Sequence, residues 1–213
     1  MKAIAINGSP RKGWNTDMIL QAALKGAADA GAEVEIIHLY DLNFTGCKSC
    51  FACKLKGAET CKCFLKDDLS PVLDKILSAD AVFFGTPIYF GEITSQMHAL
   101  IERLNFILMT YDDYTKKLFH GKVNTACFYT MNVWQEGFEK MYAERMKQSF
   151  RVLDKLNGAR EEYACCDTYQ FSNYALYQSA SFNEEHKRKM REEQFPKDLE
   201  AAYQIGQKLC KNE

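Results

Sequence analysis

Short apolar runs alternate along this chain with longer segments in which apolar residues recur every three or four positions. The short runs stop at turn-forming residues and predict five strands. These strands are Lys2–Asn7, Glu33–Leu39, Ala81–Gly85, Lys122–Tyr129 and Arg160–Asp167. The periodic segments predict helices at Asn15–Ala30, Asp68–Ser78, Ser95–Leu108 and Gln135–Asn157, then a tail from Glu184 that is helical on both sides of a break at Pro196.

Strands that alternate with helices indicate an α/β fold with a mostly parallel sheet. Five strands suit the flavodoxin-like order 2-1-3-4-5, with helices on both faces of the sheet. In that order strands 1 and 3 are neighbours whose connections leave in opposite directions, so a crevice opens at their carboxyl ends. We therefore predict one domain over residues 1–213, with a cysteine-rich loop at about 43–66 and a C-terminal helical extension at about 184–211.

The loop after the first strand carries side chains suited to an anion. Gly8 and Gly13 allow tight backbone turns. A Walker A loop is excluded, because Trp14-Asn15 stand where it requires Lys-Ser/Thr. A helix start also offers free backbone N–H groups and a positive dipole end. Simple helix capping is the alternative, but four phosphate-capable side chains favour a bound phosphate. They are Ser9, Arg11, Asn15 and Thr16.

A second loop, Gly85–Gly91, follows the third strand and meets the first loop at the predicted crevice. Pro87 stiffens it, because proline fixes its own φ and restricts the residue before it. Its aromatic side chains and backbone amides could face a flat heterocycle, whereas on its own the loop reads as a tight turn. The candidate binding residues here are Thr86, Pro87, Ile88, Tyr89, Phe90 and Gly91.

Both loops resemble the flavodoxin-like NAD(P)H-dependent FMN reductase family, and within it the iron–sulfur flavoprotein branch. The resemblance rests on Gly8-Ser9-Pro10-Arg11-Lys12-x-x-Asn15-Thr16 and on Gly85-Thr86-Pro87-Ile88-Tyr89-Phe90-Gly91. It implies that the first loop holds the FMN phosphate and that the second lines the isoalloxazine ring. It also implies homodimers or homotetramers and electron transfer from NAD(P)H or a protein donor to a small-molecule or protein acceptor.

Five cysteines lie in the long segment between the second strand and the next helix. Cys47-x-x-Cys50-x-x-Cys53 is a spacing at which three thiols can converge on one centre. By the same resemblance these three ligate a 4Fe–4S cluster, with Cys61 as the fourth ligand and Cys63 as the alternative. Zinc, free thiols and apolar packing are the competing interpretations. Because the segment leaves the second strand on the crevice side, we expect it to pass close to the flavin.

Composition and charge narrow the function further. The net charge is −1, and the lysines near residues 187–191 are interleaved with glutamates, so the chain is not expected to bind nucleic acid. No apolar run suits a membrane span, and no signal-peptide layout is seen at the start. These features lead us to expect a cytoplasmic protein. A flavodoxin-type electron carrier, usually strongly acidic, and a cysteine-based redox sensor are the alternative functions.

Overall fold

Five parallel strands form one sheet in the computed structural model of this chain, which describes residues 1–211. The order β2-β1-β3-β4-β5 confirms the predicted flavodoxin-like topology. The strands are β1 (Lys2–Asn7), β2 (Glu33–His38), β3 (Ala81–Pro87), β4 (Val123–Thr130) and β5 (Asn157–Cys165). Each neighbouring pair is parallel, so all five carboxyl ends lie along the same edge.

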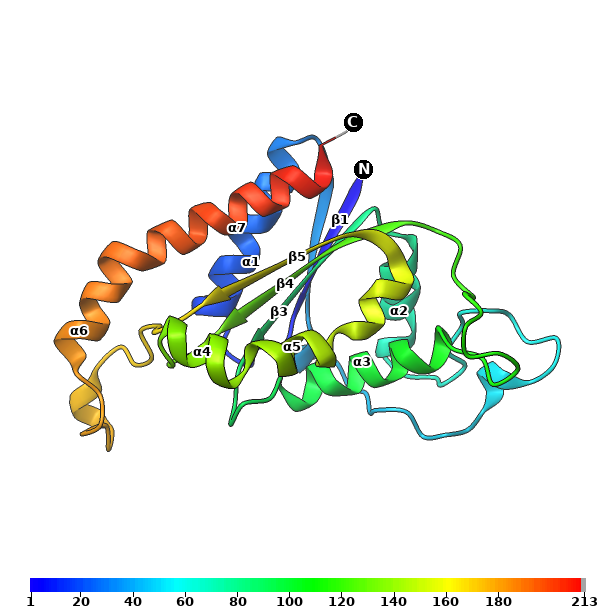
Figure 1. Cartoon of the computed structure of the whole chain (residues 1–213), viewed down its shortest axis with the longest axis horizontal. Coiled ribbons are helices and arrows are strands. Elements are labelled where there is room, and N and C mark those ends of the chain that lie inside the picture. The colour runs from blue at the N-terminus through cyan, green and yellow to red at the C-terminus, as the bar shows by residue number, and fades with distance from the viewer. Residues whose placement is uncertain (212–213) are drawn as a thin grey trace.

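Helices cover both faces of the sheet, and Figure 1 shows α1 and α7 together on one face and α3, α4 and α5 on the other. The helices are α1 (Asn15–Asp29), α2 (Leu69–Ser78), α3 (Ser95–Ile107), α4 (Gln135–Met141), α5 (Ala143–Ser149), α6 (Glu184–Lys189) and α7 (Phe195–Cys210). Within residues 1–211, none of these helices has both the length and the apolar character needed to cross a bilayer.

The residues of β1 show how the sheet divides the core in two. Ala3 and Ala5 pack toward α1 and α7, whereas Ile4 and Ile6 pack toward α2 and α3. Alternation of this kind follows from the strand geometry, in which successive side chains point to opposite faces. The small side chains of β1 thus face the layer of α1 and α7, and its larger ones help to fill the opposite layer.

The helix predicted over Gln135–Asn157 is wrong as a continuous element. The structure bends at Tyr142 between α4 and α5, and residues Arg151–Leu156 form a 3₁₀ helix. In a 3₁₀ helix every third side chain falls on the same face. The buried residues Leu153 and Leu156 follow Phe150 at that spacing, so the tighter winding keeps all three in the core.

The break predicted at Pro196 is also wrong, because the helical path continues through it. A π-helical segment, Met190–Gln194, joins α6 to α7, and Pro196 lies in the first turn of α7. Proline is tolerated there because the first backbone N–H groups of a helix lack an intrahelical acceptor. The proline thus marks the start of α7, and the irregularity lies just before it.

The carboxyl edge of the sheet positions the site. Asn7 at the end of β1 is paired with Gly85 of β3, and Pro87 at the end of β3 is paired with Thr130 of β4. Thr130 in turn is paired with Cys165, the last residue of β5. The loops that follow these four strands therefore leave the sheet side by side.

Candidate functional site: a pocket at the sheet edge and a cysteine cavity

A pocket of about 120 Å³ opens where the four loops meet, and we call it the switch-point pocket. The first loop and α1 contribute Ser9, Arg11, Trp14, Asn15 and Thr16. The loops after β3, β4 and β5 contribute Pro87, Ile88, Tyr89, Thr130, Met131, Asn132, Thr168 and Gln170. The strand-order reversal between β1 and β3 is where open α/β sheets bind ligands.

Internal hydrogen bonds hold the first loop in shape. The Asn7 amide donates to the Asp17 carboxylate at 2.9 Å, and its carbonyl oxygen accepts from the Ser9 N–H at 2.8 Å. The other Asp17 oxygen accepts from the N–H of Gly13 at 2.7 Å. Gly13 has φ +68°, a left-handed conformation that glycine adopts readily. The loop is thus fixed before any ligand arrives.

The first turn of α1 lines the pocket. Trp14, the residue before the helix, makes no side-chain capping hydrogen bond. The Arg11 guanidinium stacks over the Trp14 ring at 4.3 Å and donates to the Gln170 carbonyl at 2.8 Å. Arg11 therefore joins the loops after β1 and β5 and places a positive charge beside the helix start, an arrangement suited to an anion.

Asn15 and Thr16 connect the same helix turn to the other loops. The Thr16 hydroxyl shares a hydrogen bond of 2.7 Å with the Thr130 hydroxyl. The Asn15 amide donates to the Tyr169 carbonyl at 2.9 Å. Neither residue caps α1 in the way a simple helix start would require. Both are buried and line the pocket.

The second loop places only half of its candidate residues in the pocket. Pro87, Ile88 and Tyr89 line it, and the Ile88 N–H is held by the Thr130 carbonyl at 2.9 Å. Tyr89 is only partly buried, and this partial burial is the main cause that raises the pKa of its phenol. Phe90, with φ +54°, is fully exposed at the turn tip.

Thr86 and Gly91 have structural contacts outside the pocket. The buried Thr86 hydroxyl accepts from the Thr94 N–H at 3.2 Å, and Thr94 in turn donates to the Gly8 carbonyl at 2.8 Å. A Cβ at Gly91 would lie 2.9 Å from the Tyr142 ring. These two residues shape the loop, and sequence reasoning could not separate such a role from ligand contact.

Three side chains of the pocket carry buried polar atoms without a hydrogen-bond partner among residues 1–211. They are the indole Nε1 of Trp14, the amide oxygen of Asn132 and the amide oxygen of Gln170. A buried polar group without a partner costs free energy, so native proteins rarely leave one unsatisfied. One donor and two acceptors around one pocket fit a polar ligand that has both hydroxyl or imide donors and oxygen acceptors.

Thr168 and Gln170 are pocket residues that no sequence motif indicated. They follow β5, and Thr168 is fixed by a hydrogen bond from its N–H to the Met131 carbonyl at 2.9 Å. The available signal was topological, since the end of β5 lies beside the end of β4.

Four cysteines line a second cavity beside the C-terminal half of α3, which we call the cysteine cavity. They are Cys47, Cys50, Cys53 and Cys63, with Arg103, Phe106 and Ile107 from α3 among their neighbours. Cys61 lies elsewhere, in a surface groove with Lys62 and Asp74. Burial raises the pKa of Cys53; Lys54 opposes this, and the thiols of Cys63, Cys47 and Cys50 add to it.

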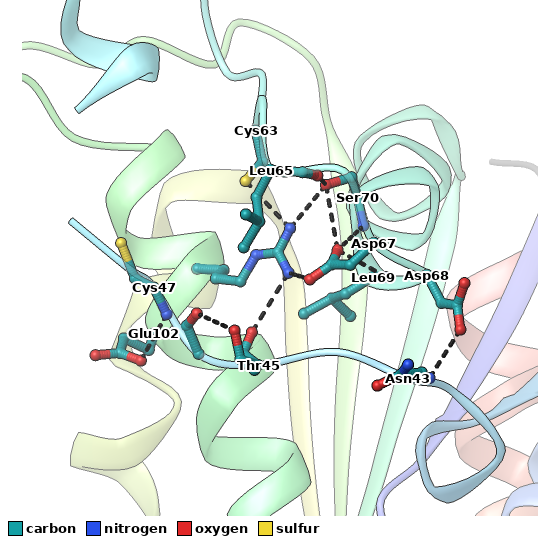
Figure 2. A network of polar contacts seen from close by, with 12 residues as sticks. Asn43, Thr45, Cys47, Cys63, Leu65, Asp67, Asp68, Leu69, Ser70 and Glu102 are labelled. Carbon is teal, nitrogen blue, oxygen red and sulfur yellow. Dashed lines mark hydrogen bonds and ion pairs between the residues drawn. The ribbon is translucent and has the colours of Figure 1, made fainter. Parts of the chain in front are cut away.

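Arg103 ties the two ends of the cysteine segment to α3, and Figure 2 labels its partners Thr45, Cys63, Asp67 and Ser70. Its side chain is only 1% exposed, and its guanidinium donates to Asp67 at 2.5 Å, Ser70 at 2.7 Å and the Cys63 sulfur at 3.2 Å. A weaker bond of 3.4 Å reaches the Thr45 carbonyl. Burial acts to raise the pKa of Asp67, but Arg103 holds it below its ordinary value.

Two sulfurs of the cysteine cavity accept hydrogen bonds from the protein. The Ser49 N–H donates to the Cys47 sulfur at 3.4 Å, and Arg103 donates to the Cys63 sulfur. Ser49 and Phe51 both have positive φ, a conformation that non-glycine residues adopt only when their surroundings impose it. Within the described residues, no three His, Cys, Asp or Glu side chains are placed to hold a single metal ion.

The expected path of the cysteine segment close to the pocket is correct only for its beginning. His38 at the end of β2 contacts Asn7 at 3.2 Å beside the first loop. The segment then follows α3. Thr94, just before α3, donates to the Gly8 carbonyl of the first loop, and Phe106 of the cysteine cavity lies twelve residues further on, roughly 18 Å along the helix. The contacts of Arg103 draw the segment along α3, so the cysteine cavity lies at the opposite end of that helix from the first loop.

Fold and pocket together define a flavodoxin-like α/β protein with an anion-suited pocket at the reversal of strand order. A family model described as NADPH-dependent FMN reductase matches residues 1–151. The chain therefore belongs to that family.

Curated relatives match about the first half of the chain. An iron-sulfur flavoprotein of Archaeoglobus fulgidus is 47% identical over 103 residues, which are 48% of this chain and 48% of the relative. An iron-sulfur flavoprotein of Methanocaldococcus jannaschii is 39% identical over 103 residues, 48% of this chain and 51% of the relative. The chain thus spans about half the length of the curated relatives it matches.

Solved structures match over nearly the whole chain. An NAD(P)H:quinone oxidoreductase from Methanothermobacter marburgensis has a TM-score of 0.72 at 15% identity and covers 98% of both chains. An azoreductase from Bacillus anthracis has a TM-score of 0.64 at 17% identity, covering 97% of this chain and 99% of its own. At these identities the likeness shows a shared fold.

Proposed function

We propose that this protein is an FMN-dependent oxidoreductase that takes electrons from NAD(P)H or a protein donor and passes them to an acceptor. The observation that carries the proposal is the switch-point pocket, which joins an uncapped helix start to unpartnered buried polar groups. FMN has a dianionic phosphate, a hydroxyl-bearing ribityl chain and a flat ring, and the pocket offers a complement for each.

The residues divide by the part of FMN they suit. Ser9, Arg11, Asn15 and Thr16 lie at the start of α1, where backbone N–H groups and positive charge favour the phosphate. Pro87, Ile88 and Tyr89 form the stiff wall suited to the isoalloxazine ring. The unpartnered amide oxygens of Asn132 and Gln170 suit donors of the ribityl chain or the ring.

Bound FMN would supply the redox chemistry, accepting a hydride from a reduced nicotinamide and delivering electrons to an acceptor. The chain's own contribution is to bind and orient the cofactor and to keep one side open. Phe90, Trp134 and Tyr89 are exposed around this edge of the sheet, where a flat substrate could stack.

Direct reduction of the bound flavin by NADH or NADPH distinguishes an NAD(P)H-dependent enzyme from a flavodoxin-type electron carrier. FMN-loaded protein is mixed anaerobically with NADH or NADPH, and the flavin absorbance is followed. We expect bleaching with at least one of the two and reoxidation when an acceptor is added. A flavin that both nicotinamides leave oxidised, but that a reduced carrier protein reduces, would support the flavodoxin-type carrier instead.

We further propose that the cysteine cavity holds a 4Fe–4S cluster with Cys47, Cys50, Cys53 and Cys63 as ligands. Support comes from the shared cavity of these four thiols and from hydrogen bonds to two of the sulfurs. Iron–sulfur clusters are held by four thiolates, and hydrogen bonds to the sulfurs tune them. A cluster also spreads its ligands more widely than one ion does, which suits a cavity without a single-ion site.

Anaerobic reconstitution with iron and sulfide tests the cluster and its fourth ligand. Wild type should bind about four irons per chain and gain a broad visible absorbance. Cys63→Ala should lose the absorbance, whereas Cys61→Ala, the matched control, should keep it. Loss in Cys61→Ala with retention in Cys63→Ala would assign the fourth ligand to Cys61. No iron uptake by the wild type would leave a flavin reductase with free thiols.

A further inference from the structure

Arg191 reaches the phosphate-suited turn of α1 from the far end of the chain. It lies in the π-helical segment Met190–Gln194, and its guanidinium donates to the Asn15 amide oxygen at 3.0 Å. The same group contacts the Met18 sulfur at 3.0 Å and stacks over the Phe195 ring at 4.1 Å. The family match ends at residue 151, so this contact is not part of the matched region.

The Arg191 guanidinium has no carboxylate at ion-pair distance in the described part of the chain. Burial lowers the pKa of Arg191. A partly buried cation without a counter-charge is unfavourable unless a ligand supplies one. The anion-suited start of α1 is the neighbouring place where a ligand could do so.

Both polar atoms of the Asn15 amide are engaged by the protein. Its oxygen accepts from Arg191, and its nitrogen donates one hydrogen to the Tyr169 carbonyl. These two contacts fix which way the amide points, because a flipped amide would place its NH₂ against a guanidinium and its oxygen against a carbonyl. The second amide hydrogen stays available at a residue that lines the switch-point pocket.

We propose that Arg191 is a positioning residue for the phosphate of the bound flavin, acting through Asn15. It holds the Asn15 amide with an N–H toward the anion and adds positive charge behind the α1 turn. The C-terminal extension thereby becomes part of the cofactor site. This inference rests on the proposed FMN function. The π-helical segment at Arg191 is consistent with a role in the cofactor site. Such segments are rare in proteins as a whole, and those that occur often lie at functional sites.

Because riboflavin is FMN without its phosphate, comparing the affinities of the two flavins gives the contribution of the phosphate to binding. Apo-protein is titrated with each flavin, and quenching of flavin fluorescence gives the two affinities. In Arg191→Ala we expect FMN affinity to fall about tenfold or more while riboflavin affinity stays unchanged. Arg191→Lys keeps the charge without the planar fork and should recover part of the loss. Arg188→Ala, an exposed arginine three residues earlier, is the control and should match wild type.

A double-mutant cycle with Asn15 tests the route of the effect. In an Asn15→Ala background, adding Arg191→Ala should reduce FMN affinity by less than it does in the wild-type background, because only the charge of Arg191 is then left to lose. Equal loss of FMN and riboflavin in Arg191→Ala and Arg191→Lys would show a general structural role and overturn the inference. An unchanged FMN preference in both variants would overturn it while leaving the proposed function intact. Wild type that binds neither flavin would overturn both.

Discussion

At the scale of single residues, Trp14 shows how a residue of a binding site can lower the stability of the ligand-free fold. Its indole N–H is buried without a partner among residues 1–211, and the ring lines the switch-point pocket beside Arg11. An unsatisfied buried donor destabilises the fold by on the order of 1 kcal/mol, and a ligand acceptor would recover that loss.

Replacing Trp14 with Phe should therefore act in opposite directions on stability and binding. Without the indole N–H, the ligand-free protein should gain up to about 1 kcal/mol in the free energy of unfolding. FMN affinity should fall about tenfold. Urea denaturation of apo-protein and flavin titration measure the two effects. A variant that loses stability and keeps its FMN affinity would show that the indole N–H serves the fold.

At the scale of elements, α1 and α7 pack backbone to backbone. A Cβ at Gly206 would lie 1.9 Å from the Ala23 carbonyl oxygen, and one at Gly26 would lie 2.0 Å from the Tyr203 carbonyl oxygen. The two glycines thus allow a reciprocal close approach. Figure 1 shows the two helices crossing on one face of the sheet.

Gly206→Ala should force α7 away from α1. Because the contact is with backbone, no side-chain rotation can relieve it, and we expect a loss of about 2–4 kcal/mol in the free energy of unfolding. Gln204→Ala, at an exposed position of α7, is the control and should stay within about 0.5 kcal/mol. Urea denaturation compares them, and a Gly206→Ala protein as stable as wild type would disprove the close packing.

The contacts between α6 and the segment after β5 depend on the charge of Asp167. Lys187, which is buried, forms an ion pair with Asp167 and donates to the Asn132 carbonyl at 3.1 Å. His186 contacts the other Asp167 oxygen at 2.6 Å. Burial acts to raise the pKa of Asp167, but hydrogen bonds from Lys187 and His186 lower it overall.

A lowered carboxyl pKa gives the stability a definite pH dependence. Its contribution is fully present above the ordinary value of 3.8 and is lost as pH falls through the pKa of the folded state. Asp167→Asn should cost on the order of 3 kcal/mol at neutral pH, since Lys187 stays buried without its partner. Denaturation at several pH values should show this difference shrinking in acid. A difference independent of pH would contradict the assignment.

The elements that sequence predicted well are those whose pattern is local. The apolar run Lys2–Asn7 identifies β1, and the strand order predicted for such folds places the loops after β1 and β3 side by side. The 3₁₀ winding at residues 151–156 was missed because it depends on contacts of Leu153 and Leu156 with the core. The break predicted at Pro196 was wrong because a proline can either interrupt a helix or occupy its first turn, and the sequence alone does not distinguish the two.

At the scale of the whole molecule, the site draws on parts of the chain that sequence cannot connect. Gln170 and Arg191 reach the first loop from more than 150 residues away, and neither lies in a recognisable motif. The path of the cysteine segment likewise depends on Arg103, whose partners Asp67 and Cys63 are distant in sequence. Long-range packing of this kind is fixed by tertiary structure.

Assembly into a homodimer or homotetramer stays a prediction. The segment after β5 is the surface we expect to be covered, because Leu176 and Tyr177 are exposed there and its neighbour Gln170 lines the pocket. Light scattering at micromolar concentration should give a dimer or tetramer, and Leu176→Glu should shift it to monomer. A monomeric wild type would contradict the prediction.

The central claim, that the switch-point pocket binds FMN through the α1 turn, is tested most directly by titrating apo-protein with FMN. We expect flavin fluorescence to be quenched with saturation at one FMN per chain. The double variant Arg11→Ala, Thr16→Ala should weaken binding by about a hundredfold or more, since it loses two phosphate-suited groups. Lys12→Ala, which removes an exposed lysine of the same loop, should change it little. Fluorescence unchanged by wild-type protein, or quenched equally by the double variant, would contradict the account.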